Sequence, residues 1–215
     1  MPHTIVLDGD NLDCETLYTI GYNPSVVIEL AEESKERIKH SRQIVQDIVD
    51  KDAIKYGINT GFGNFATVKI GKEDLADLQR NLIRSHAAGV GRPLTNDRAR
   101  MLLALRINVL AKGFSGISLS IVESLIAALN KNCISYIPEK GTVGASGDLA
   151  PLAHMALGMM GEGKMYNPTT EKYEEAALVL REHGLTPIDL GAKEGLAMIN
   201  GTQFITSLGA EATFR

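Results

Sequence analysis

A glycine-rich run at residues 141–151 restricts the fold of this chain more than any other stretch. It reads Gly-Thr-Val-Gly-Ala-Ser-Gly-Asp-Leu-Ala-Pro, so small residues precede an acid and a proline. Backbone with so few Cβ atoms can fold tightly, and an acid followed by proline is typical of the first turn of a helix. We therefore expect a compact loop that leads directly into a helix.

Three interpretations of this loop are open from its residues alone. It could bind phosphate through backbone N–H groups, although its glycine spacing matches neither G-x-G-x-x-G nor the P-loop. It could be a plain turn in which Ser146 or Asp148 caps the helix, which composition favours. In the third, the Gly147 nitrogen attacks the Ala145 carbonyl, and loss of water and of the Ser146 hydroxyl leaves a methylidene-imidazolone ring. Such a ring is an electrophile, which no ordinary side chain provides.

The longer run at residues 141–154, which continues with Leu-Ala-His, resembles the signature of the aromatic amino acid ammonia-lyases. In that family, which includes histidine and phenylalanine ammonia-lyases, an Ala-Ser-Gly tripeptide becomes a methylidene-imidazolone prosthetic group. The resemblance implies that Ala145, Ser146 and Gly147 are catalytic and form this group by autocatalytic cyclisation. It implies no external cofactor and no metal.

A second glycine-rich segment, residues 56–63, reads Tyr-Gly-Ile-Asn-Thr-Gly-Phe-Gly. Three glycines disfavour a helix and weaken a strand, so we expect a shaped loop. From the residues alone, Tyr56 and Phe62 would be packed onto the core. The segment also resembles the lyases, whose tyrosine at this position reaches the active site. The resemblance implies that Tyr56 is the general base that removes the β-proton of the substrate.

Apolar residues at spacings of three and four predict a helix over residues 72–88 that ends at Gly89. A histidine in the last turn of a helix is ordinarily a cap or a packed core residue. Residues 78–89 resemble the lyase segment that faces the substrate side chain, and the pair Ser85-His86 matches histidine-specific members, whereas Phe-Leu and His-Leu pairs mark phenylalanine and tyrosine specificity. The resemblance implies that His86 and Ser85 bind the imidazole of L-histidine, since a site built for a polar ring rejects an apolar one.

Residues 193–203 resemble the next motif of the family, whose asparagine contacts polar groups of the substrate and the prosthetic group. The resemblance implies this role for Asn200, while the residues alone equally allow a helix-interior amide bonded to a neighbouring carbonyl. His154 is expected to be a satisfied core histidine. The remaining predictions are a strand over residues 3–8 and helices over residues 24–50, 96–110, 118–130, 152–160 and 171–183.

The resemblance implies a mainly α fold of the fumarase/aspartase-like superfamily. We expect residues 1–150 to form an N-terminal mixed helical domain that carries the prosthetic-group loop, and residues 151–215 to begin a long central helical bundle. The chain ends at Arg215 in a helical pattern, whereas family members continue. We therefore expect that further site residues lie outside this sequence and that the chain alone is inactive.

The composition and charge of the chain bear on which classes of binding partner it can have. The 215 residues are 44% hydrophobic and 22% charged, as in soluble globular proteins. A net charge of −4 with scattered basic residues gives no electrostatic case for binding nucleic acid or anionic membrane. Cys14 and Cys133 lie far apart without metal-ligand spacing, and no apolar run of about 18 residues occurs. We expect a cytoplasmic protein with a small-molecule substrate and, from the resemblance, a homotetramer with shared active sites.

The resemblance implies that the parent protein converts L-histidine to trans-urocanate and ammonia. Two alternatives stay open. One is a phenylalanine or tyrosine ammonia-lyase, or an aminomutase, of the same family. The other is an inactive fragment or assembly module in which Ser146 never cyclises.

Overall fold

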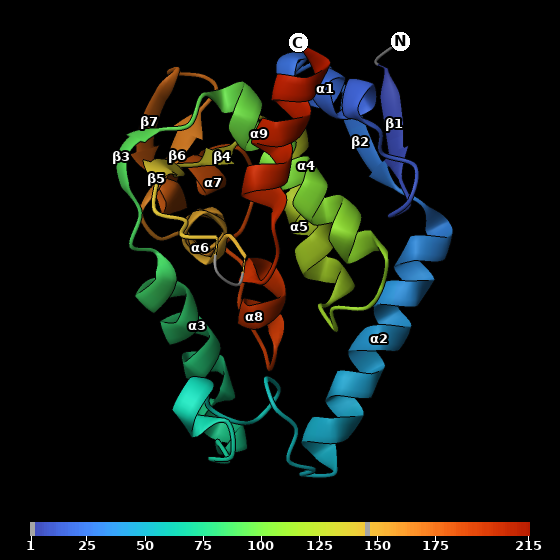
Figure 1. Ribbon diagram of the computed structural model, residues 1–215, viewed down its shortest axis with the longest axis vertical. Coiled ribbons are helices and arrows are strands. Elements are labelled where there is room, and N and C mark those ends of the chain that lie inside the picture. Colours follow the sequence, from blue (N-terminus) through green and yellow to red (C-terminus); the bar gives the residue numbers. More distant parts are fainter. Residues whose placement is uncertain (1–2, 145–146) are drawn as a thin grey trace.

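The computed structural model describes residues 3–144 and 147–215, so Ala145 and Ser146 lie outside the described residues. The described part is mainly helical, with small two- and three-stranded sheets at its periphery (Figure 1). The helices are α1 Cys14–Tyr22, α2 Glu32–Asp50, α3 Leu75–His86, α4 Asn96–Ala111, α5 Leu119–Asn130, α6 Leu149–Met159, α7 Ala176–Glu182, α8 Glu194–Ile199 and α9 Gln203–Phe214. The strands are β1 Thr4–Leu7, β2 Val27–Leu30, β3 Val90–Pro93, β4 Ile134–Ser135, β5 Pro138–Lys140, β6 Lys164–Asn167 and β7 Lys172–Glu175.

Helix α4 lies at the centre of the molecule and contacts α1, α5 and α9 (Figure 1). Its sequence is apolar on nearly every side, which predicts burial, and most of its side chains are indeed buried. Two of them are arginines, Arg100 and Arg106, each about 1% exposed. A buried guanidinium is tolerated only where acceptors surround it, so α4 must carry polar links as well as apolar contacts.

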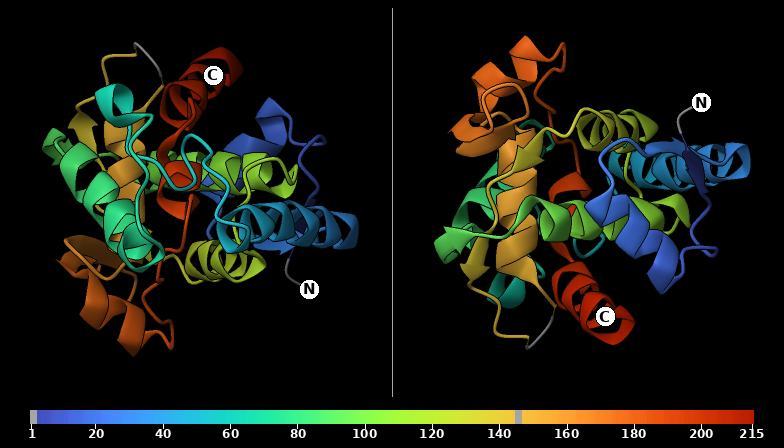
Figure 2. Two further views of the ribbon diagram at one scale, coloured as in Figure 1. Left: turned by 90° about the horizontal axis from the view of Figure 1, so that it is seen from below. Right: turned by 90° about the horizontal axis from the view of Figure 1, so that it is seen from above.

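Helices α2 and α3 lie on opposite sides of the molecule, with α4, α8 and α9 between them, in the views of Figures 1 and 2. Helices α3, α6 and α8 contact one another and form the scaffold of the site described below. None of the helices in the described residues is long and apolar enough to cross a membrane. The division into two domains at residue 150 stays a prediction.

The helix predicted over residues 24–50 is wrong at its start. Val27–Leu30 form β2, which pairs in parallel with β1, and α2 begins only at Glu32. Ile28 and Leu30 are buried while Glu29 between them is exposed, as in a strand. The Asn130 side chain also accepts from the Ile28 N–H at 2.8 Å and donates to the Ile28 carbonyl at 2.9 Å. Strand β1 and Asn130 stabilise the extended backbone of β2. Both are distant in sequence, so a local sequence pattern cannot reveal them.

The helix predicted over residues 171–183 is also too long at its start. Lys172–Glu175 form β7, which pairs antiparallel with β6, and only Ala176–Glu182 are helical. The ring of Tyr173 packs edge-on against Tyr166 across the two strands, with centroids 5.8 Å apart.

Helix α1 was not predicted, although Asp13 caps it by accepting from the Thr16 N–H at 2.8 Å. That Asp-Cys-Glu-Thr start is a usable N-terminal signal.

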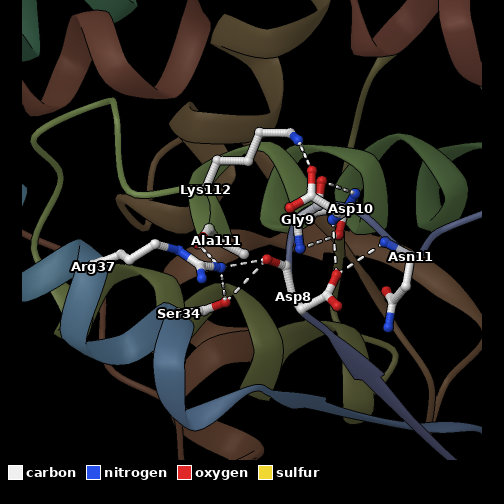
Figure 3. Close-up of polar contacts among 9 residues, drawn as sticks. Asp8, Gly9, Asp10, Asn11, Ser34, Arg37, Ala111 and Lys112 are labelled. Atoms are coloured by element: carbon white, nitrogen blue, oxygen red, sulfur yellow. Dashed lines mark hydrogen bonds and ion pairs between the residues drawn. The ribbon is translucent and has the colours of Figure 1, made fainter.

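The turn after β1 is fixed to the end of α4 by polar contacts (Figure 3). The Gly9 N–H donates to Asn108 Oδ1 at 3.0 Å, and Asn108 Nδ2 donates to the Gly9 carbonyl at 3.3 Å. Arg37 from α2 donates to the Asp8 carbonyl at 2.6 Å, and Lys112 pairs with the exposed Asp10. The buried part of this contact is the Gly9–Asn108 pair, which makes it the stronger anchor of the N-terminal segment.

We predict that Asn108→Ala lowers the free energy of unfolding by about 1–3 kcal/mol, because the buried Gly9 N–H and carbonyl both lose their partner. Asp10→Asn is the matched control, since it weakens an exposed ion pair at the same turn and should have little effect. Urea unfolding of both variants measures the difference. Equal losses in the two variants would contradict the assignment of Asn108 as the anchor.

Candidate functional site

Ser85, His86, Gly147 and Asn200 lie where the C-terminus of α3, the N-terminus of α6 and the C-terminus of α8 meet. A cleft of about 240 Å³ lies between the end of α3 and the glycine-rich loop. Ser85 and His86 line one side of it, and Thr142, Gly147 and Leu149 are among the residues on the other. The structure thus brings the Ser85-His86 pair beside the predicted cyclising loop, although the two segments lie far apart in the sequence.

Gly147 is held directly against the backbone that follows α8. Its φ is +118°, and a Cβ added there would lie 2.6 Å from the Gly201 carbonyl oxygen. The next residue, Asp148, donates its N–H to the same oxygen at 2.7 Å. Only glycine fits at residue 147, both because of its backbone conformation and because of this contact.

Asp148 links three segments of the site, a role that sequence reasoning missed. The residue is about 1% exposed. Its Oδ1 accepts from the Thr142 hydroxyl at 2.9 Å, and its Oδ2 accepts from the Ile205 N–H, in the first turn of α9, at 2.9 Å. The interpretation in which Asp148 caps its own helix is wrong, because its carboxylate makes no capping bond to α6. A buried carboxylate beside two helix N-termini is electrostatically favourable.

Ser85 and His86 are oriented by the last turn of α3. The Ser85 hydroxyl donates to the Leu82 carbonyl at 3.0 Å, and His86 Nδ1 lies 2.9 Å from the same oxygen and 3.1 Å from the Ser85 hydroxyl. Because a carbonyl can only accept, the neutral His86 ring carries its proton on Nδ1. Its Nε2 is then an acceptor, suited to an N–H of a substrate ring. Both residues also line an adjoining hollow of about 500 Å³ whose walls include Phe62 and Phe65.

Tyr56 lies on the loop between α2 and α3 and is not among the described residues that line the cleft. Its side chain is 62% exposed, whereas Phe62 is half-buried and packs edge-on against the Tyr56 ring with centroids 6.3 Å apart. The packed-core interpretation is therefore correct for Phe62 and wrong for Tyr56. The next residue, Gly57, lies against Leu196 of α8, so the loop borders the same helix that ends at the site.

Asn200 ends α8 and is exposed, which rules out the alternative of a helix-interior amide. Its N–H donates to the Leu196 carbonyl at 3.0 Å, and its own carbonyl accepts from Arg106 Nη1 at 3.1 Å. The residue directly precedes Gly201, whose carbonyl contacts Gly147 and Asp148. Asn200 is thus the neighbour of the residue that contacts the glycine-rich loop.

His154 is a satisfied, half-buried histidine, as predicted. Its Nε2 accepts from the Gly89 N–H at 3.0 Å, so this nitrogen is unprotonated. Gly89 follows the Ser85-His86 segment and also lies against Gly141 at the start of the loop. Burial lowers the pKa of His154 from its ordinary value of 6.5, which keeps the ring neutral. The imidazole therefore ties the end of α3 to α6.

In residues 3–144 and 147–215, no group of three or more His, Cys, Asp or Glu side chains is arranged to hold a metal ion. The polar groups that converge on the cleft are instead backbone amides and carbonyls, a serine, a histidine and the carboxylate of Asp148.

The chain matches a family model described as aromatic amino acid lyase over residues 12–215. It is 54% identical to histidine ammonia-lyase of Mus musculus over 211 residues, which cover 98% of this chain and 32% of that protein. It is 47% identical to histidine ammonia-lyase of Streptococcus sanguinis, with 100% of this chain and 41% of that protein covered. The chain thus spans about a third to two-fifths of the length of these curated relatives.

Among solved structures, the fold is similar to histidine ammonia-lyase from Trypanosoma cruzi, with a TM-score of 0.92 and 50% identity. The superposition covers 98% of this chain and 40% of that one. This similarity confirms the mainly helical, fumarase/aspartase-like fold expected from the sequence.

We predict that acid weakens the contact between His154 and Gly89. The unfolded chain takes up a proton on this histidine near its ordinary value of 6.5, whereas the folded protein does so only at lower pH. The stability due to the neutral ring is therefore fully present above about pH 6.5 and is lost as pH falls through the lower, folded pKa. His154→Gln, which keeps an acceptor but does not titrate, should show a smaller fall in Tm between about pH 7.5 and about pH 5.5.

The matched control is His40→Gln, since His40 is exposed on α2. It should retain the pH dependence of the wild type. If His154→Gln and His40→Gln have the same pH profile of Tm, His154 does not act in this way.

Proposed function

Because this chain belongs to the aromatic amino acid lyase family, we propose that it forms part of an ammonia-lyase that converts L-histidine to trans-urocanate and ammonia. The single observation that carries the proposal is the cleft that sets Ser85 and His86 beside Gly147. The relatives with the same fold that are named histidine ammonia-lyase support it. Groups that complete the site would come from the rest of the protein or from other copies of it, and we propose a cytoplasmic homotetramer with shared sites.

The family is known to use a methylidene-imidazolone group, and we propose that Ala145, Ser146 and Gly147 form it here. The described neighbours of the tripeptide fit this group. Gly147 has a backbone conformation and a contact that exclude any side chain, and Asp148 fixes the next residue to Gly201 and α9. Once formed, the group supplies an electrophile for the amino group of the substrate.

The side chains around the cleft would bind and orient the amino acid. His86, with its Nδ1 proton held by the Leu82 carbonyl, would present Nε2 as acceptor to the N–H of the substrate imidazole. Ser85, which lies 3.1 Å from His86 Nδ1, would keep that ring in place. Asn200 would donate to or accept from the polar groups of the amino acid at the other side of Gly147.

Tyr56 would act as the general base that takes the β-proton of the substrate. Its exposed ring is held at one edge by Phe62, while its hydroxyl is available to a ligand that lies over the loop. An exposed aromatic on a loop next to a cleft is typical of binding and catalytic surfaces rather than of a core. The β-proton would thus leave toward the loop of Tyr56, which borders α8 through Gly57.

We predict that Ser146→Ala in the full-length protein abolishes urocanate formation, because without the serine hydroxyl no methylidene group can form. Intact mass measures the chemistry directly, since cyclisation and dehydration remove two waters from the wild type, whereas the variant has no serine hydroxyl to lose and cannot lose both. Ser120→Ala, at an exposed position on α5, is the control and should match the wild type. An unmodified mass in an active wild-type protein would refute the proposed electrophile.

We also predict that His86→Leu shifts the substrate preference from histidine toward phenylalanine. Loss of the imidazole removes the acceptor for the substrate ring and leaves an apolar surface beside Phe62 and Phe65. The ratio of kcat/KM for histidine to that for phenylalanine should fall by about 100-fold or more. Assays of urocanate and cinnamate formation give this ratio, and cinnamate as the preferred product of the wild type would favour the phenylalanine lyase alternative.

A further inference from the structure

Arg106 places a buried positive charge behind the site, on the central helix α4. Its guanidinium is about 1% exposed. Nη1 donates to the Asn200 carbonyl at 3.1 Å and to Gln203 Oε1 at 2.8 Å, and Nη2 donates to the Ala197 carbonyl. All three acceptors belong to the end of α8 or the start of α9. A single planar group therefore spans the connection between these two helices.

The acceptors explain why the charge is tolerated there. The last carbonyls of a helix lack partners within it and form the negative end of its dipole, so a cation is stabilised beside them. Burial lowers the pKa of Arg106 only to about 10, and the side chain stays charged at neutral pH. Helix α8 has six residues, which is too short to be stable alone. The last turn of α8 contains no basic residue, and Arg106 supplies the positive charge there instead.

The guanidinium also packs on Gly201. A Cβ added at Gly201 would lie 2.5 Å from Arg106 Nη1 and would clash with Gln203. On its other side, the Gly201 carbonyl accepts from the Asp148 N–H and lies against Gly147. Gly201 thus lies between Arg106 and Gly147, in close contact with both. Asn200, which precedes Gly201, is held by the same guanidinium through its carbonyl.

From this arrangement we propose that Arg106 is a positioning residue, which fixes Asn200 and the Gly201 carbonyl against the residues that form the electrophile. The inference rests on the proposed function. Arg106 lies behind the backbone of Gly201 and acts on the reaction only through the segment that it holds. Displacement of a positioned group by about 1 Å can lower a rate by about 100-fold, so loss of this restraint is expected to affect kcat.

The chain contains a matched control for this proposal. Arg100, on the same helix, is equally buried and has its pKa lowered by burial to about 10 as well. It donates to the carbonyls of Ile20 and Leu129 and to Asn132 Oδ1, at 2.9 to 3.1 Å. These acceptors belong to α1 and to the end of α5, away from the cleft. Arg100 therefore reports what a buried arginine contributes to the fold alone.

The experiment compares Arg106→Lys and Arg100→Lys in the full-length protein. Lysine keeps the charge but not the planar fork, so each variant loses part of its hydrogen bonds. We expect similar decreases in Tm for the two variants. We expect kcat for histidine to fall by about 10- to 100-fold only in Arg106→Lys, with little change in KM, since an interaction that matters in the transition state is weakened.

A further variant, Gln203→Leu, removes one acceptor of the guanidinium without changing its charge. It should lower kcat in the same direction by a smaller factor, and it decides the question if Arg106→Lys fails to fold. Equal kcat in Arg106→Lys and Arg100→Lys, or an unchanged kcat in Gln203→Leu, would overturn the role of Arg106. A wild-type protein that neither forms urocanate nor loses two waters would instead refute the proposed function, so the two failures are distinguishable.

Discussion

The hydrogen bond from the Asp148 N–H to the Gly201 carbonyl is the contact on which the rest of the site depends. It closes the glycine-rich loop onto the end of α8 and leaves space only for a glycine at residue 147. Through it, the loop, the start of α6 and the connection from α8 to α9 become one unit. Gly147 and Asp148 are thereby held beside the residue that follows Asn200.

Buried charges hold this unit in place. Helix α8 has the carboxylate of Glu194 at its N-terminus, where it accepts from the Ser118 N–H at 2.8 Å and the Gly191 N–H at 2.6 Å. It has the guanidinium of Arg106 at its C-terminus. Each charge is opposite in sign to the nearby end of the helix dipole. Asp148 likewise places a negative charge at the N-terminus of α9, where its carboxylate accepts from an N–H of the first turn. Such buried polar networks are costly if incomplete, so they favour a single arrangement of the backbone.

Local patterns predicted the elements whose stability is largely local. The helix around Leu82 follows the spacing of its apolar residues, and the helix around Ile107 follows a nearly continuous apolar run. The prediction was wrong at Lys172–Glu175, where β7 forms a hairpin with the preceding β6, and at Val27–Leu30, because the partners of that strand, β1 and Asn130, lie elsewhere in the chain. The roles of Asp148 and Arg106 were missed for the same reason. The apolar residues around Arg106 indicate that it is buried but not what it binds, since its acceptors lie 91 to 97 residues away.

The sequence by itself determined which motifs are present, and the proposed chemistry rests on them. The Ala145-Ser146-Gly147 tripeptide within its glycine-rich run, the Tyr56 loop, the Ser85-His86 pair and Asn200 are recognisable because they are short motifs of fixed residue types. Only the tertiary structure decided which of them meet. It sets Ser85 and His86 across a cleft from Gly147, joins Gly147 to the residue after Asn200, and leaves Tyr56 exposed on a loop beside α8. The physical reason is that these distances are fixed by hydrogen bonds and close packing between segments far apart in the chain, which residue order does not record.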